Sequence, residues 1–153
     1  METKIGSLEH VSGHTYDTIY DLLFTTERVI AVIIRHPNDS IQKIGLTGLL
    51  LGERLAGGND RFQRIKIAEE RRRDYQEKPF DEIVKSHRFN LEIHYNTVTS
   101  VEITRGIFKS RLKFQISRPS IPERTLHFTL SKKQVPTARN LLDLALPSKT
   151  KGR

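Results

Sequence analysis

The stretch LFTTERVIAVII, residues 23–34, decides how this chain is interpreted. It ends in six consecutive apolar residues and is followed by the polar residues 35–37, so it is far shorter than the roughly 20 apolar residues of a membrane-spanning helix. Most of the six are β-branched, which favours a strand. Residues 16–24, rich in Tyr, Ile, Leu and Thr, precede them across a short polar stretch. This arrangement is typical of a β-hairpin in the core of a sheet.

Composition indicates a folded, basic domain. The chain has 153 residues, enough for one domain with its own core. It contains no cysteine, which excludes disulfides, thiolate chemistry and zinc–cysteine sites. The first 14 residues hold no apolar stretch of signal-peptide length, so we expect no transmembrane segment and a cytoplasmic location. The net charge of +8 predicts attraction to an acidic partner, either nucleic acid or anionic lipid.

Periodicity divides the chain into three regions. Residues before 36 read as strands, and after residue 88 apolar and polar side chains alternate, as in LEIHY, VEI, RLKFQIS and TLHFTL. Strands that are apolar on one side only predict an antiparallel sheet with one face on a core and one in water. Between these regions, residues 41–55 read as a helix ended by Gly57-Gly58, residues 59–76 as a second helix, and residues 80–86 as a third opened by Pro79.

The last strand leads into a helix. Ser131 and Gln134 have the spacing of a capping box. Apolar residues then recur at helical spacing, and Pro147 ends the run. Pro136 removes one backbone donor early in this helix, which predicts a distorted or 3₁₀ first turn. The recurring apolar residues are Val135, Ala138, Leu141, Leu142 and Ala145.

Three segments resemble bacterial and archaeal pleckstrin-homology-like (PH-like) and GRAM-like domains: YDLLFTTERVIAVII, IHYNTVTSVEITRGIFKSRLKFQI and TLHFTLSKKQVPTARNLLDLAL. The resemblance implies a mainly β fold, a half-open barrel of about seven antiparallel strands closed by a C-terminal helix. Residues 1–147 would form this single domain, with a helical insertion at about 37–88 between the third and fourth strands. Residues 148–153 would form a basic, flexible tail.

The same resemblance implies a binding module rather than an enzyme, used for lipids, peptides or self-assembly. Lipid-binding members hold phosphoinositides with basic residues after the first strand, but residues 11–14 contain no Lys or Arg. Enzyme motifs such as GxSxG, a P-loop or HExxH are missing from the sequence. The six histidines form no metal-ligand spacing, and we expect them to be exposed. No catalytic residue, cofactor or metal is therefore expected.

The segment TRGIFKSR, residues 104–111, supplies the first candidate site. We expect Gly106 to allow the chain reversal through a positive φ angle. No acid occurs between Glu102 and Glu123. An apolar apex ringed by cations suits an anionic membrane surface; alternatively, Phe108 folds back onto the barrel and the cations are simply solvated. The candidate contacts are Arg105, Ile107, Phe108, Lys109, Arg111 and Lys113.

Residues 41–76 supply two further candidates. A ridge of small residues in the expected first helix suits packing against a second copy of the chain, although the helix also suits docking on its own barrel or lying on a bilayer. The ridge consists of Gly45, Gly48, Gly52 and Ala56. The basic stretch RFQRIKIAEERRRDYQ is either a membrane- or partner-binding helix or a solvated helix with internal ion pairs.

The sequence thus favours a non-enzymatic PH-like binding or scaffolding domain. Its partner would be an anionic membrane surface, another protein or a second copy of itself. The alternative is a nucleic-acid-binding protein that uses its basic surface. Only 7% of residues are aromatic, and no strand carries the paired aromatics that stack RNA bases, so nucleic acid is the less favoured partner.

Overall fold

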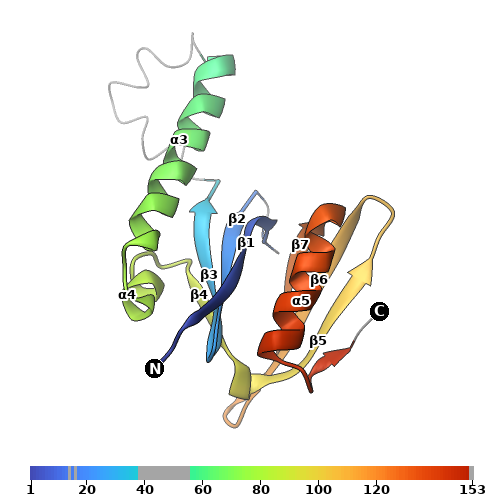
Figure 1. Cartoon of the computed structure of the whole chain (residues 1–153). Coiled ribbons are helices and arrows are strands. Elements are labelled where there is room, and N and C mark those ends of the chain that lie inside the picture. The colour runs from blue at the N-terminus through green and yellow to red at the C-terminus, as the bar shows by residue number, and fades with distance from the viewer. Residues whose placement is uncertain (14, 16, 38–55, 152–153) are drawn as a thin grey trace.

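The structure is a computed structural model that describes residues 1–13, 15, 17–37 and 56–151, with side chains except at 56–62 and 151. It is mainly β, as predicted (Figure 1). Along the chain come β1 (Lys4–Ser12), β2 (Ile19–Thr25), β3 (Arg28–Arg35), α3 (Ala56–Gln76), α4 (Phe80–Lys85), β4 (Leu91–His94), β5 (Val98–Arg105), β6 (Lys109–Arg118), β7 (Ile121–Ser131), α5 (Val135–Ala145) and β8 (Thr150–Lys151).

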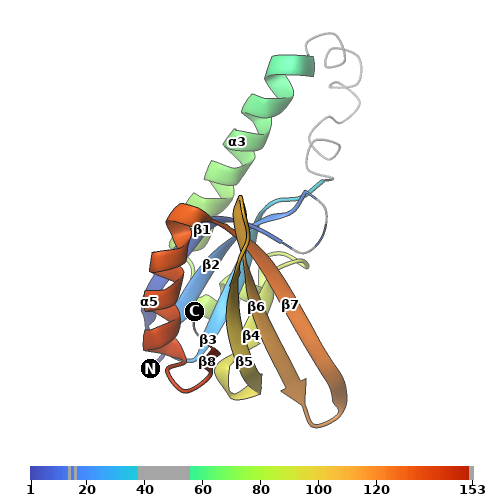
Figure 2. The same cartoon turned by 90° about the vertical axis from the view of Figure 1, so that its right-hand side faces the viewer.

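The strands form one sheet in the order β4-β3-β2-β1-β7-β6-β5-β8. Strands β1 to β7 pair antiparallel, and β1 joins β7 through a single residue pair, Ser12 with Thr129. The sheet bends at this short junction, so that its two halves enclose a shared interior (Figure 2). One apolar cluster draws on β1 to β7 and on α5, where Ala138 and Leu142 are fully buried. The predicted antiparallel sheet and closing helix are therefore confirmed.

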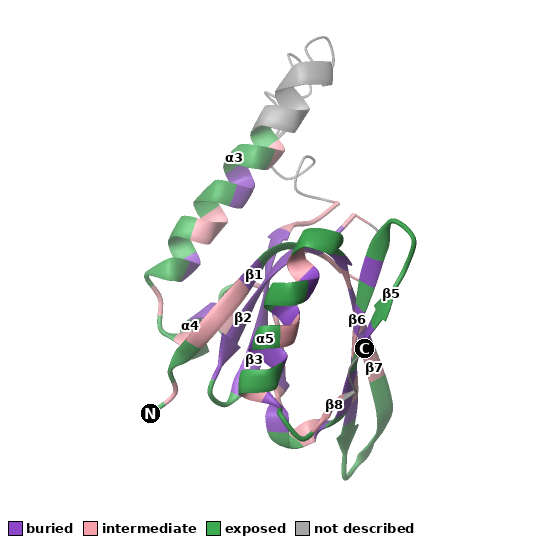
Figure 3. Ribbon diagram, turned by 45° about the vertical axis from the view of Figure 1, so that its right-hand side comes forward, coloured by how far each residue is buried: buried purple, intermediate pink, exposed green. Residues whose placement is uncertain are grey.

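Strands β2 and β3 are buried on both faces, unlike the other strands. The inner face lies on the main core, and α3 and α4 cover the outer face (Figure 3). This outer cluster consists of Leu23, Ile30, Val32, Ile34, Ala68, Tyr75 and Ile83. Double-sided burial explains why residues 29–34 are continuously apolar, because neither face of the strand meets water.

Strands β5 to β7 alternate as predicted. Leu112, Phe114 and Ile116 face the core, while Arg111 and Lys113 face away from it. The rings of Phe114 and Phe128 pack edge to face, with centroids 6.2 Å apart. The outer face of these strands therefore presents polar side chains, as a one-sided sheet should.

The helix boundaries differ from the expectation at Gly57-Gly58. Gly57 and Gly58 are both helical within α3 (Ala56–Gln76), so they do not end a helix. The expected helix at 41–55 lies outside the described residues. Helix α4 begins after Pro79, as predicted. Before α5, residues Lys132–Gln134 form the expected 3₁₀ turn.

Residues 149–151 also differ from the expectation of a flexible tail over 148–153. Thr150 and Lys151 form β8, which pairs parallel with Val101 and Glu102 of β5. The Lys149 Nζ donates to the backbone carbonyl of Tyr95 at 2.7 Å. Backbone pairing with an otherwise open sheet edge holds residues 150–151 on the sheet.

Candidate functional site

Strands β5 and β6 are joined by a tight turn at Gly106. Its backbone N–H donates to the carbonyl of Lys109 at 3.0 Å, and a Cβ atom on Gly106 would collide with the same oxygen. No described glycine has a positive φ, so the expected role of Gly106 is wrong. Glycine is required here because the backbone of the opposite arm approaches too closely for a side chain.

Two large apolar side chains stand at the apex of this hairpin. Ile107 is 80% exposed and Phe108 is 84% exposed. The alternative in which Phe108 folds back onto the barrel is therefore wrong. The reason lies one row below, where the inward-facing positions of β5 and β6 are Arg105 and Ser110. These polar residues offer Phe108 no apolar surface, since the last apolar pair on these strands is Ile103 with Leu112.

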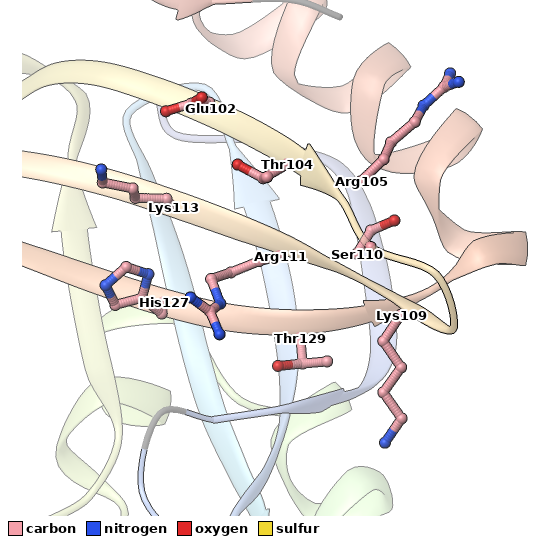
Figure 4. A pocket seen from close by; sticks show the side chains of 10 residues that line it. Glu102, Thr104, Arg105, Lys109, Ser110, Arg111, Lys113, His127 and Thr129 are labelled. Carbon is pink, nitrogen blue, oxygen red and sulfur yellow. The ribbon is translucent and has the colours of Figure 1, made fainter.

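The cations near the apex point to two sides of the hairpin (Figure 4). Lys109 and Arg111 point to the outer face, whereas Arg105 points toward the side of α5. Arg105, Lys109 and Arg111 are exposed, and Lys113 is half-buried. Lys113 lies directly opposite the acidic Glu102 in the strand register. Five of the six predicted contacts thus surround the tip, and Lys113 lies further down the sheet.

A groove of about 430 Å³ runs along the outer face below the tip. Two cross-strand rows form its floor, Thr104-Arg111-Thr129 and Glu102-Lys113-His127. Glu102 is the one acidic residue among the described residues that line it. Thr104, His127 and Thr129 were not among the predicted contacts. Only the pairing of β5 and β7 with β6 shows that these residues are neighbours of Arg111 and Lys113.

Two buried polar clusters hold the helices in place. Asp21 on β2 is fully buried and accepts hydrogen bonds from Arg72 Nε at 2.7 Å and from the Tyr75 hydroxyl at 2.6 Å. Burial and the hydrogen bond to Asp21 raise the pKa of Tyr75 above its ordinary value. The second cluster surrounds Arg28, whose guanidinium contacts three carboxylates. Each charge in these clusters has a partner, so we interpret them as structural.

Helix α3 combines docking with ion pairs. Ile67, Ala68 and Tyr75 are buried, whereas Ile65 is half exposed. Ion pairs join Arg64 to Asp17, Arg72 to Asp21 and Lys78 to Asp74. These contacts favour the interpretation of α3 as a helix that packs on the sheet and is stabilised by ion pairs. In the self-association ridge, Gly45, Gly48 and Gly52 and the Ala56 side chain lie outside the described residues.

Within the part of the chain that the structure describes, no three His, Asp or Glu side chains gather closely enough to hold a metal ion. No described helix is both long and apolar enough to cross a bilayer. No family model matches the sequence, and neither does any curated protein. The β5–β6 tip is therefore the site on which a functional proposal rests.

Proposed function

We propose that this protein is a non-enzymatic, PH-like binding domain that attaches peripherally to anionic membranes through its β5–β6 tip. The observation that carries the proposal is the exposure of Ile107 and Phe108, at 80% and 84%, at the apex of a cationic hairpin. Side chains of this size are costly to leave in water, and a membrane interface accepts them. Lys109 and Arg111 stand where they would meet lipid phosphates.

The expected binding free energies support reversible attachment to the membrane. Full burial of a Phe or Ile side chain contributes about 1.5–3 kcal/mol. Each cation near an anionic surface contributes about 1 kcal/mol. One small tip therefore binds weakly alone and responds to lipid charge. We place the protein at a cytoplasmic leaflet, because that leaflet carries the anionic lipids.

The strand order and closing helix support the PH-like assignment. The proposed site, however, lies elsewhere than the lipid site of that family. The loop after β1 carries no Lys or Arg over residues 11–14. The apolar and cationic residues gather instead on the β5–β6 tip. The proposed contact therefore uses a different part of the sheet from the phosphoinositide loop of lipid-binding PH-like domains.

Vesicle co-sedimentation tests the proposal at low salt, with phosphatidylcholine vesicles that contain phosphatidylserine. The wild type should bind them, and the double charge reversal Lys109→Glu/Arg111→Glu should abolish binding without changing the melting curve. The matched control is Arg118→Glu/Arg124→Glu, at the exposed β6–β7 turn on the opposite end of the same strands. The proposal fails if the wild type does not bind or if both double variants lose binding equally.

Salt titration separates this function from nucleic-acid binding. Contacts with nucleic-acid phosphates weaken linearly on a log–log plot of affinity against salt. We expect vesicle binding to retain an apolar component at high salt that depends on Phe108. Tight, salt-sensitive binding to duplex or single-stranded nucleic acid, with no vesicle binding, would replace the membrane proposal by the nucleic-acid alternative.

A further inference from the structure

The side of the tip that faces α5 forms a second groove, of about 290 Å³. It is lined by Arg105, Gly106, Ser110, Lys132, Val135 and Pro136. Arg105 and Ser110 occupy inward-facing positions on β5 and β6, but they lie beyond the last apolar pair of these strands. Their side chains lie on the α5 side of the hairpin, opposite to Lys109 and Arg111 (Figure 4).

Ser110 is the unusual residue in this groove. It is 3% exposed, yet among the described residues no group forms a hydrogen bond with its hydroxyl. The residue lines both the outer groove and the α5 groove. The Ser110 hydroxyl is not among the fully buried polar atoms without a partner, so water in the groove can reach it. A ligand oxygen in the groove would take the place of that water and accept the hydroxyl proton.

The charge of the groove indicates the chemistry of that ligand. Arg105 comes from the end of β5 and Lys132 from the 3₁₀ turn before α5, so two separate elements bring cations to one place. None of the described lining residues is acidic. Val135 and Pro136 open α5, and the positive end of that helix dipole therefore faces the same space. The groove combines a guanidinium, an ammonium and a hydroxyl donor around one point.

We propose that the groove binds a phosphomonoester group. A phosphomonoester carries up to two negative charges and three terminal oxygens, which match two cations and one hydroxyl better than the single charge of a carboxylate does. Arg105 would pair with two oxygens, Lys132 would neutralise charge, and Ser110 would donate its proton to the third oxygen. This inference rests on the proposed function for its ligand: a lipid with a terminal phosphate, at the surface that the tip contacts.

The membrane arm of the test compares phosphatidic acid with phosphatidylserine, in phosphatidylcholine vesicles of equal zeta potential. The wild type should bind the phosphatidic acid vesicles about tenfold more tightly, because a hydrogen bond to a charged group is added. Ser110→Ala should remove this preference and leave binding to phosphatidylserine unchanged. Ser117→Ala, on the exposed far end of β6, is the matched control and should keep the preference.

The solution arm titrates the full chain with inorganic phosphate, with chloride at equal ionic strength as the reference. Amide NMR shifts should appear at Arg105, Ser110 and Lys132 and should weaken in Ser110→Ala. If Ser110→Ala changes the melting curve, the exposed Lys132→Ala takes its place.

The outcomes separate the two proposals. Equal affinity for both vesicles, without phosphate shifts, overturns the phosphomonoester site and leaves the membrane function standing. Phosphate shifts that depend on Ser110, without binding to any vesicle, overturn the membrane function and support a site for free phosphate compounds. Phosphate shifts of the same size in wild type and Ser110→Ala overturn the site.

Discussion

Arg28 shows at the scale of one residue how this fold handles a buried charge. Its guanidinium is largely buried and donates to Glu2 at 2.9 Å, to Asp81 at 2.6 Å and to Glu92 at 2.7 Å. These carboxylates come from the N-terminus, α4 and β4, so one side chain ties three segments to β3. Burying a charge is costly, and several partners in good geometry are needed to offset that cost.

The first prediction concerns acid stability. Burial alone would raise the pKa of Glu2, but hydrogen bonds from Arg28 and Thr25 outweigh burial and lower the pKa below 4.5. A hydrogen bond from Arg28 also lowers the pKa of Asp81 below 3.8. Because both pKa values are lower in the folded state, the stabilisation is present above about pH 4.5 and lost as pH falls further. Arg28→Met should reduce this acid sensitivity.

Urea unfolding at pH 7 and at steps below pH 4.5 measures the effect. Arg28→Met should lose about 1.5–3 kcal/mol at pH 7, because the partly buried carboxylate of Glu2 loses its hydrogen bonds from Arg28. Its free energy of unfolding should then fall less steeply with acid than that of the wild type. Arg124→Met, at an exposed arginine, is the control. Parallel pH profiles for Arg28→Met and the wild type would contradict this interpretation of the cluster.

The roles of Arg28 and Gly106 could not be predicted from the sequence. The pairs of Arg28 with Glu2 and Asp81 span 26 and 53 residues, and no local pattern connects such positions. Gly106 was identified as essential for the hairpin, but for the wrong reason. A glycine in a turn suggests a positive φ, whereas here the carbonyl of Lys109 excludes a side chain. A close backbone approach of this kind becomes visible only in three dimensions.

At the scale of elements, α3 depends on one buried carboxylate. Asp21 binds Arg72 through both carboxylate oxygens and also accepts the Tyr75 hydroxyl. We predict that Arg72→Ala destabilises the protein by about 3–5 kcal/mol, because it leaves a fully buried carboxylate without its cation. Tyr75→Phe should cost less, about 1.5–3 kcal/mol, because it removes a single hydrogen bond to the charged group.

Equilibrium urea unfolding ranks the two variants. Arg73→Ala serves as the control, because Arg73 is exposed on the same helix and should change stability by less than about 0.5 kcal/mol. If Arg72→Ala unfolds at the same urea concentration as Arg73→Ala, Asp21 does not hold α3 on the sheet.

The sequence predicted most elements but not how α3 meets the sheet. Alternation identified the inward faces of β5 to β7, because each of these strands has one wet side. Residues 29–34 are apolar throughout and so could not show what covers the second face. The available signal was Asp21, a carboxylate between Tyr20 and Leu22 in an apolar strand. A charge at such a position implies a partner that the strand itself does not contain.

At the scale of the whole molecule, α5 completes the core that the bent sheet leaves open. Leu142 is fully buried in the main apolar cluster, whereas Leu144 on the same helix is 70% exposed. Leu142→Ala should cost about 2–5 kcal/mol, a large share of the stability of a domain. Thermal unfolding should show a clear loss for Leu142→Ala and almost none for Leu144→Ala. Equal melting of the two variants would show that the helix is not part of the core.

The sequence predicted which residues form the candidate site but not how their side chains are arranged. Acid-free sequence around Ile107 and Phe108 identified the tip, since composition alone shows an apolar pair among cations. The direction of Phe108 could not be predicted, because it depends on where the core ends. On β5 and β6 the apolar core stops before the polar pair Arg105 and Ser110, and the side chains beyond this pair remain in solvent. The same geometry creates the α5 groove, which composition did not reveal.

Fluorescence of a single introduced tryptophan tests membrane insertion of the tip most directly. The chain contains no tryptophan, so Phe108→Trp places the only indole at the apex, and Ile121→Trp places one at the exposed opposite turn as a control. With anionic vesicles at low salt, the account predicts that the emission of the Phe108→Trp protein shifts to the blue and is quenched by brominated acyl chains, with neither effect in the Ile121→Trp protein. Vesicle binding without a blue shift in the Phe108→Trp protein, or equal quenching of both proteins, would contradict it.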